Sequence, residues 1–195
     1  AVSEATDGAA AGAGVVFGVI AGTGTGGGIV IDGRPVSGAN AIAGEWGHNP
    51  LPWPRPDELP GPACYCGKRG CIETWLSGPG FAAFYETMTC ERHTAEEIVR
   101  LAEKGSAAAE RALERYEDRM ARALASVVNI LDPDVIVLGG GMSNIERLYE
   151  NVPRRWVDYI FSDRVETRLV PPKHGDSSGV RGAAWLWGPG AAGKG

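Results

Sequence analysis

The amino-acid sequence predicts an α/β domain built on a mixed β-sheet, with a cysteine-rich loop inserted after the first strands. Two observations carry this prediction. Three short strands follow one another between Val15 and Val36, and beyond residue 78 helical patterns alternate with strand patterns. Strands joined by tight turns pair in an antiparallel manner and those alternating with helices suit an α/β arrangement, so one sheet is expected to contain both kinds of pairing.

The first elements follow from local composition. Residues 2–11 are alanine-rich and predict a helix, and Val15–Ile20 is a continuous apolar run rich in β-branched residues, typical of a buried strand. A glycine-rich loop, Gly22–Gly28, then leads to a second strand at Ile29–Ile31. The dipeptide Asp32-Gly33 is typical of a tight hairpin turn into the third strand.

Helix signals dominate the middle of the chain. Pro79 suits the first turn of a helix, and Thr94 with Glu97 forms a capping box for another helix that ends near Glu103. A longer helix opens after Gly105. Its apolar residues repeat at intervals of three and four, which indicates a core-facing stripe rather than a cofactor site: Leu113, Tyr116, Met120, Leu124, Val127, Val128 and Leu131.

Asp132-Pro133 ends that helix, because proline cannot continue it. The elements expected after it are a buried strand at 134–138, helices near 145–151 and 153–161, a strand at 167–170, a last helix at 177–187 and a disordered tail at 188–195.

Three of the four cysteines fall within eight residues, at Cys64, Cys66 and Cys71, and His48 lies upstream. Three thiolates and one imidazole make a complete tetrahedral set for Zn²⁺, with no position left for water, so the metal is expected to be structural. A Cys66–Cys71 disulfide is the alternative, but it leaves Cys64 without a partner, and a chain without a secretion signal favours metal ligands. Cys90 is expected to be a free thiol.

Two carboxylates flank this cluster. Glu45 lies three residues before His48, and Glu73 lies two residues after Cys71, so a bound metal would hold both in place. Fixed carboxylates beside an imidazole suit the recognition of several hydroxyl groups, as on a sugar. His48 could serve both purposes, with one ring nitrogen on zinc and the other donating to a substrate hydroxyl. The alternative is that both acids are solvated surface residues.

Two glycine-rich turns could approach a phosphate or a nucleotide. In Gly22–Gly28 the backbone N–H groups are unshielded, and Thr23 or Thr25 can add a hydroxyl. The run is neither a Walker A loop nor a Rossmann fingerprint, since no Gly-Lys-Ser/Thr and no helix follows. Gly139, Gly140 and Gly141 follow a strand, where α/β sheets bind nucleotides. An ordinary turn is the alternative at both places.

Composition excludes several classes of function. The chain has 195 residues, 44% of them hydrophobic and 22% charged, which is typical of a soluble globular protein. A formal net charge of −5 without a basic run argues against nucleic acid as a partner. No apolar run approaches the length of a membrane span, and the first residues lack a signal peptide. With clustered metal-type cysteines, these features predict a cytoplasmic location.

The segments Glu45-Trp46-Gly47-His48 and Cys64–Glu73 together resemble the signature of the ROK family of sugar kinases and repressors, E-x-G-H followed by C-x-C-G-x-x-G-C-x-E. The segments Ser37–Trp53 and Lys173–Trp187 are most similar to its bacterial fructokinase/mannokinase branch, and the resemblance runs from about Val2 to Trp187. It implies the actin/hexokinase-like, ribonuclease-H-like fold.

The resemblance also implies an ATP-dependent hexose kinase with Mg²⁺ and a structural Zn²⁺, assembled as a homodimer. Fructose is the expected sugar, with mannose or glucose next. It assigns sugar binding to Glu45, His48 and Glu73, and zinc binding to His48, Cys64, Cys66 and Cys71. It assigns phosphate contacts to Thr23 and Gly24, and adenosine contacts to Gly139, Gly140 and Gly141. The alternatives are a sugar-responsive ROK repressor, which carries a helix-turn-helix before this region, and an inert zinc domain.

The sequence departs from the family pattern in one respect. It contains neither the D-x-G-G-T phosphate motif nor the N-D-A-N segment whose Asp is the catalytic base. We therefore expect a C-terminal portion of a kinase with no catalytic base of its own and no turnover when alone. The expected organisation is a remnant of the N-terminal domain at 1–13, a kinase domain at 14–176 with its zinc loop at 48–73, a helix at 177–187 that returns toward the N-terminal domain, and the tail at 188–195.

Overall fold

The computed structural model describes residues 1–173 and 175, and within them five strands form one mixed sheet in the order β3-β2-β1-β4-β5. The central strand β1 (Val15–Ala21) pairs antiparallel with β2 (Thr25–Ile31) and parallel with β4 (Val135–Gly139). The edges are β3 (Arg34–Pro35) and β5 (Arg168–Val170). The predicted mixed sheet is therefore confirmed.

The hairpin of β1 and β2 differs from the prediction in its second strand, which begins at Thr25 and not at Ile29. Gly26, Gly27 and Gly28 pair with residues of β1 in regular register. The prediction was wrong because glycine clusters usually mark turns, whereas ladder hydrogen bonds need only the backbone. At the next turn, Asp32 and Gly33 have φ angles of 48° and 73°, as the predicted hairpin requires.

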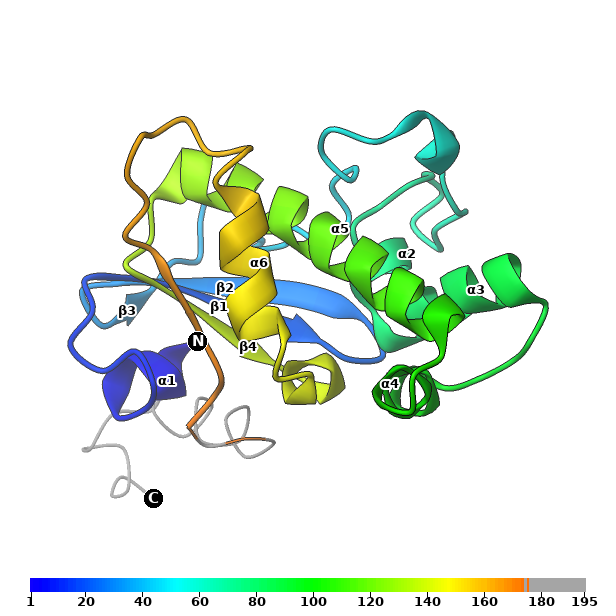
Figure 1. Cartoon of the computed structure of the whole chain (residues 1–195). Coiled ribbons are helices and arrows are strands. Elements are labelled where there is room, and N and C mark those ends of the chain that lie inside the picture. The colour runs from blue at the N-terminus through cyan, green and yellow to red at the C-terminus, as the bar shows by residue number, and fades with distance from the viewer. Residues whose placement is uncertain (174, 176–195) are drawn as a thin grey trace, which may run out of the picture.

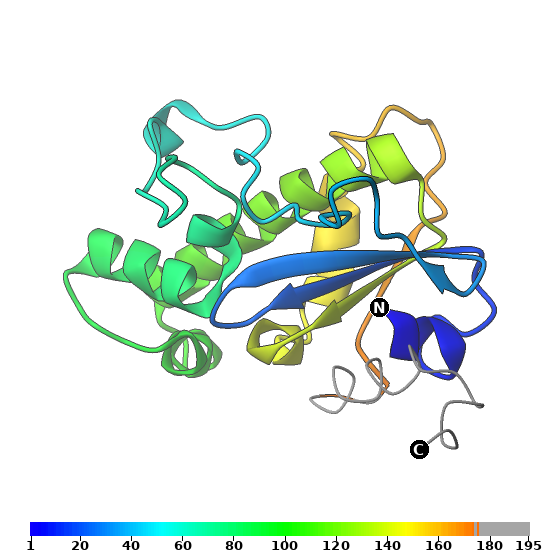
Figure 2. The same cartoon turned by 180° about the vertical axis from the view of Figure 1, so that it is seen from behind.

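Five helices cover one face of the sheet or extend from its edge in the described part of the chain (Figures 1 and 2). The longest, α5, runs diagonally across the sheet, and α6 lies beside it (Figure 1). The bounds are α2 (Glu73–Leu76), α3 (Gly78–Thr89), α4 (Ala95–Glu103), α5 (Ala107–Leu131) and α6 (Leu148–Trp156). The predicted Thr94 capping box is present at the start of α4.

The apolar stripe of α5 forms the centre of the main core, as the sequence predicted. Leu113, Tyr116, Met120 and Leu124 are fully or almost fully buried, together with the inward-facing residues of β1 and β4. Tyr116 donates a hydrogen bond from its hydroxyl to the carbonyl of Leu76 at 2.8 Å, which satisfies a polar group in an apolar site. The stripe therefore fixes α2 as well as the sheet.

The opposite face of the sheet carries α1 (Val2–Thr6), shorter than the helix predicted over residues 2–11 (Figure 1). After α1 the chain turns back at Gly8, where a Cβ atom would lie 2.5 Å from the Cα of Glu4. Alanine content favoured a longer helix, but this close approach ends it. A second small core forms between α1 and the sheet, around Val16 and Val135.

The region after β4 also corrects the prediction. A short 3₁₀ turn, η2 (Gly141–Asn144), precedes α6, which is one helix with Pro153 inside it, not two helices divided near that proline. Burial of Val152 and Trp156 against α5 outweighs the lost backbone hydrogen bond. The predicted helix at 177–187 and the tail at 188–195 lie outside the described residues. Among those described, no helix is long and apolar enough to cross a membrane.

Candidate active site

The segment that carries Glu45 and His48 lies directly on β2. Trp46 is buried, packs edge-on against Phe17 with ring centroids 5.6 Å apart, and donates from its indole nitrogen to the carbonyl of Gly26 at 3.0 Å. A Cβ atom on Gly47 would lie 1.9 Å from the carbonyl oxygen of Thr25, so only glycine fits there. Packing against the sheet therefore fixes the backbone that leads into His48.

His48, Cys64, Cys66 and Cys71 come together as the sequence predicted, with their ligand atoms all within 4.8 Å of one another. The Sγ atoms of Cys66 and Cys71 are 3.6 Å apart, and Nδ1 of His48 is 3.5 Å from Sγ of Cys64. A tetrahedron with zinc–sulfur bonds of about 2.3 Å has edges of roughly 3.8 Å, so this donor set fits Zn²⁺. The four cysteines, all within the described residues, are unbridged.

The thiols themselves favour a cation at this point. Burial, and then hydrogen bonds in which the Cys71 thiol donates to the sulfur atoms of Cys66 and Cys64, raise the pKa of Cys71 well above its usual value. A backbone hydrogen bond from Lys68 lowers the pKa of Cys66. A cation among the sulfur atoms would stabilise the thiolates. It would thereby offset the unfavourable free energy of bringing three sulfur atoms close together. With four protein ligands the ion would be closed to water and structural.

The second ring nitrogen of His48 already has a partner in the protein. Its Nε2 lies 2.8 Å from the hydroxyl of Tyr65, and the two rings are perpendicular. A metal on Nδ1 would leave the proton on Nε2, so Tyr65 would accept the hydrogen bond. The sequence predicted a substrate hydroxyl in this place. Tyr65 is 84% exposed, so its side chain can rotate away from His48.

Glu73 joins two segments: the loop at 48–73 that carries the four candidate ligands (the metal loop), and the turn at 22–24 between β1 and β2 (the glycine turn). Its backbone N–H donates to the carbonyl of Gly47 at 2.9 Å, and its Oε2 accepts from the N–H of Thr25 at 2.9 Å. A Cβ atom on Gly24 would lie 2.8 Å from the same carboxylate oxygen. Glu45, in contrast, is exposed and lines a separate hollow of about 500 Å³ on the sheet face with Gly26, Gly27 and Gly28.

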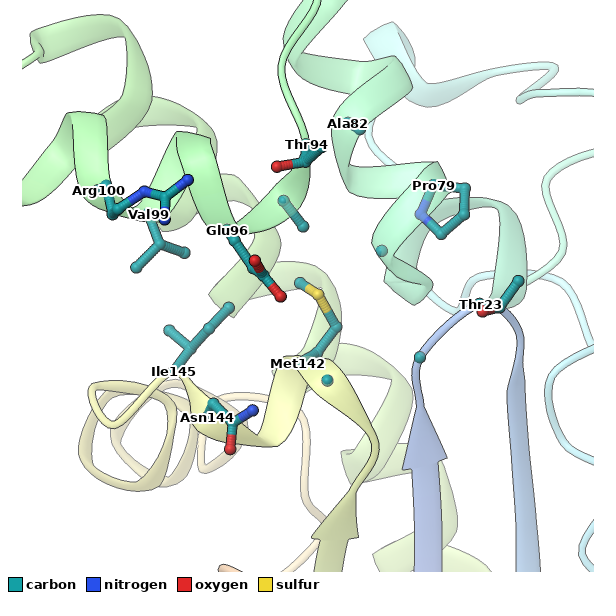
Figure 3. A pocket seen from close by; sticks show the side chains of 14 residues that line it. Thr23, Pro79, Ala82, Thr94, Glu96, Val99, Arg100, Met142, Asn144 and Ile145 are labelled. Carbon is teal, nitrogen blue, oxygen red and sulfur yellow. The ribbon is translucent and has the colours of Figure 1, made fainter. Parts of the chain in front are cut away.

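A pocket of about 800 Å³ opens on the other side of that turn, between α3, α4 and η2 (Figure 3). In Figure 3, Thr23 lies at one end beside Pro79, while Glu96 and Asn144 extend toward the space between α4 and η2. Its walls are largely apolar, and its volume is in the range of small-ligand sites. Its lining includes Gly22, Thr23, Glu96, Met142, Asn144 and Ile145.

The predicted nucleotide residues do not all line this pocket. Thr23 and Gly141 do, whereas Gly139 and Gly140 line the hollow that contains Glu45. Gly140 has a φ of 83°, and a Cβ there would lie 2.5 Å from the carbonyl oxygen of Ala21, so it permits β4 to turn close to β1. Gly140 thus sets the path of the chain from β4 into η2.

Two N–H groups of the glycine turn are used within the protein. The N–H of Gly22 donates to the carbonyl of Gly24, and that of Thr25 donates to Glu73. The turn is held against α3, because the N–H of Gly78 donates to the carbonyl of Gly22 at 2.7 Å. These bonds present Thr23, at the tip of the turn, to the pocket.

Sequence reasoning missed the far wall of the pocket. Glu96, Val99 and Arg100 come from α4, whose capping box had suggested only a helix start. It also missed Tyr65 as a partner of His48. No periodicity or motif signals these contacts, because each joins segments brought together by folding.

Comparisons with known proteins identify related sequences and folds. The family model described as ROK family matches residues 1–189. The N-acetyl-D-glucosamine kinase of Photobacterium profundum is 42% identical over 190 residues, which are 95% of this chain and 63% of that protein. The chain thus spans less than two thirds of this relative.

Two solved structures share the fold. The ROK hexokinase of Thermus thermophilus superposes with a TM-score of 0.83 at 32% identity, covering 94% of this chain and 60% of that one. A ROK family glucokinase from Streptomyces griseus, in complex with glucose and AMPPNP, superposes with a TM-score of 0.81 at 25% identity, covering 94% and 64%.

Proposed function

The chain belongs to the ROK family, and from this premise we propose that it forms the nucleotide pocket and part of the sugar site of an ATP-dependent sugar kinase. The observation that carries the proposal is the contact between Glu73 and the glycine turn. One carboxylate touches both the metal loop and the turn beside the 800 Å³ pocket. Phosphoryl transfer requires the acceptor hydroxyl and the terminal phosphate to meet, and this is the junction where they would do so.

The nucleotide would lie with its base between α4 and η2 and its phosphates at Thr23 and Gly24. Polar groups support this orientation, because the turn offers phosphates the hydroxyl of Thr23 and backbone N–H groups. Apolar side chains such as Met142 and Ile145 suit the faces of a purine ring. The AMPPNP bound to the S. griseus glucokinase supports ATP as the nucleotide.

Glu45, His48 and Glu73 would bind the hydroxyl groups of the sugar. Glu73 is already fixed by Thr25 and Gly47, so it is preorganised to accept from a hydroxyl. A carboxylate beside the phosphate turn repels a bare triphosphate, which is a reason to expect Mg²⁺ as the counter-ion. His48, Cys64, Cys66 and Cys71 would hold Zn²⁺, which would orient the imidazole of His48 and take no part in the chemistry.

N-acetylglucosamine is the first sugar to test, because the Photobacterium profundum relative, 42% identical to this chain, is named for it. The fructokinase/mannokinase branch predicted from residues 37–53 and 173–187 receives no support from these relatives. Fructose, mannose and glucose stay in the test as alternatives. The homodimer that the resemblance implies stays a prediction.

The retained nucleotide pocket weighs against a sugar-responsive repressor or an inert zinc domain, since neither uses ATP. The test is binding of AMPPNP with Mg²⁺, and then of each sugar, to the zinc-loaded chain by calorimetry. We expect nucleotide binding that Thr23→Glu weakens, because a carboxylate at the turn would repel the phosphates, with Thr87→Glu, exposed on α3 and outside the pocket, as the matched control. A chain that binds no nucleotide would contradict the kinase proposal.

A further inference from the structure

One buried carboxylate, Glu58, fastens the loop that precedes the cysteines to α5. It ends the short 3₁₀ turn η1 (Pro56–Glu58), and its side chain is fully buried. Its Oε1 accepts hydrogen bonds from Arg119 at 2.8 Å, Arg122 at 2.9 Å and Arg115 at 3.1 Å, and its Oε2 accepts from the backbone N–H of Arg55 at 2.8 Å. Three guanidinium groups of one helix thus converge on one loop residue.

The same helix also binds the loop backbone directly. Arg122 donates from Nη1 to the carbonyls of Pro52 at 3.2 Å and Trp53 at 2.9 Å. Asp118, one turn earlier on α5, pairs with Arg55 at 2.8 Å and with Arg122 at 2.9 Å. Residues 52–58 are therefore attached to α5 at several points without any contribution from a metal.

Arg119 extends the attachment to the segment that follows the last cysteine. Its guanidinium lies 4.2 Å from the ring centre of Trp75 on α2 and 3.8 Å from that of Phe84 on α3. Trp75 follows Cys71 by four residues. Glu58 and Arg119 thus connect the two chain segments that lead to the metal ligands, one before Cys64 and one after Cys71.

The charges in this cluster are compensated, so it can persist on its own. Burial alone would raise the pKa of Glu58, but hydrogen bonds from Arg122, from the Arg55 backbone and from Arg119 outweigh it and lower the pKa to about 2. A buried carboxylate held by several donors is costly to expose or to leave unpaired. Residues 52–58 should therefore stay in place when the metal leaves.

Residues 62–70 are held by contacts of a different kind from those of residues 52–58. They form a small hairpin closed by backbone bonds from Cys64 to Lys68 and from Gly70 to Pro62, and Tyr65, Cys66 and Lys68 at its tip are exposed. Such a hairpin has little apolar surface to bury. Its position therefore depends on Cys64 and Cys66 binding a metal.

We propose that Glu58 is a positioning residue for the metal centre, which fastens residues 52–58 to α5 whether or not a metal is bound. Loss of the metal then frees the hairpin at 62–70 and the ring of His48, while Glu73 keeps its bonds to Thr25 and Gly47. The same fastening keeps the chain segments on both sides of that hairpin in place, so fewer residues have to be ordered when the ion binds. The inference rests on the metal site and not on the proposed kinase activity.

Hydrogen exchange on the unaltered chain gives the first test. The zinc-loaded chain is compared with the chain stripped by a strong chelator, and peptides are followed by mass spectrometry. We expect faster exchange in residues 62–70 after stripping, and unchanged exchange in residues 52–60 and at the N–H of Glu73. Equal loss of protection in 52–60 and 62–70 would overturn the proposal, because the loop would then be one metal-dependent unit.

Variants give the second test. Glu58→Gln should release zinc to a chromogenic chelator at least tenfold faster than the parent, whereas its neighbour Asp57→Asn, exposed and bound only to Arg115 among the contacts described, should change the rate less than twofold. Arg115→Met removes one of three guanidinium donors and gives a milder variant if Glu58→Gln folds poorly. Zinc release from Arg115→Met and Glu58→Gln at the parental rate would overturn the proposal.

Discussion

Cys66 is the exposed member of the metal cluster, so its substitution tests the metal with little damage to the core. We expect about one zinc per chain in the parent, on the four-ligand stoichiometry. Cys66→Ser should lose the ion and unfold at a lower temperature, because a serine hydroxyl is a poor zinc ligand and metal binding contributes to folding. Metal analysis and thermal unfolding measure both effects. Cys90→Ser, outside the cluster and also exposed, is the control and should keep the ion. Full zinc retention in Cys66→Ser would contradict the four-ligand site.

Glu73 is the residue at which the proposed sugar and phosphate sites meet. Replacing it with alanine removes the acceptor for the N–H of Thr25 and for a substrate hydroxyl. A lost charged hydrogen bond of about 1.5–3 kcal/mol corresponds to a roughly ten- to hundredfold weaker sugar affinity. Calorimetric titration with N-acetylglucosamine measures it. Glu91→Ala, an exposed acid on a distant loop, is the control, and equal sugar affinity in the two variants would remove Glu73 from the site.

Residue spacing was sufficient to predict that His48, Cys64, Cys66 and Cys71 come together, because all four lie within one short stretch and each residue type has a definite affinity for zinc. It was not sufficient for the partners of the ligands. The Tyr65 hydroxyl on His48 and the Thr25 N–H on Glu73 depend on how the loop folds over β2. The expectation that zinc alone would hold Glu45 and Glu73 also ignored the packing of Trp46 and Gly47 against the sheet.

At the scale of elements, two successive glycines after β4 differ in their tolerance of a side chain. Position 140 requires glycine, whereas position 141 has room for a Cβ atom. Gly140→Ala should destabilise the turn, because it combines a φ of 83° with a Cβ 2.5 Å from a backbone oxygen. Strain of this kind costs about 1–3 kcal/mol. A Cβ on Gly141 meets no atom within 4 Å, so Gly141→Ala is the control for stability. Thermal unfolding compares them, and equal melting temperatures would show that the turn relaxes.

The attachment of the metal loop to α5 has a pH dependence. Because the pKa of Glu58 is lowered from 4.5 to about 2 in the folded protein, its stabilisation is complete above pH 4.5 and is lost as the pH falls toward 2. The difference in unfolding free energy between the parent and Glu58→Gln should therefore shrink over that interval. Urea unfolding at several pH values measures it, with Asp57→Asn as the reference. A constant difference down to pH 2 would mean that the carboxylate charge contributes nothing.

Elements with a strong periodic pattern were predictable and those shaped by neighbours were not. The stripe of α5 and the apolar run of β1 need only local sequence to be identified. Gly26, Gly27 and Gly28 became a strand because β1 offers them a ladder, and Pro153 stayed inside α6 because its helix is buried on α5. In both cases tertiary packing outweighed local preference.

At the scale of the whole molecule, the proposed nucleotide pocket lies beside one side of the proposed sugar site, and the sequence lacks the N-D-A-N motif that would supply a base. We therefore expect the chain to bind nucleotide and yet to transfer no phosphate. A coupled assay with ATP, Mg²⁺ and N-acetylglucosamine should show no turnover, with the chain confirmed as folded and zinc-loaded. Sugar-dependent turnover would mean that a residue of this chain serves as the base.

The position of β1 at the centre of the sheet has a consequence for how the protein folds. β1 meets β2 across a turn of three residues, but its other neighbour, β4, comes from far along the chain, and Val15 bonds to Asp134 across 119 residues. The hairpin and the loop around His48 and Cys71 can form early, from segments already close together. Closing the parallel pair requires a much longer search, so that step should set the refolding rate. A newly made chain would then expose the open edge of β1 until α5 and β4 have been synthesised, and it is during this interval that it would be most prone to aggregation.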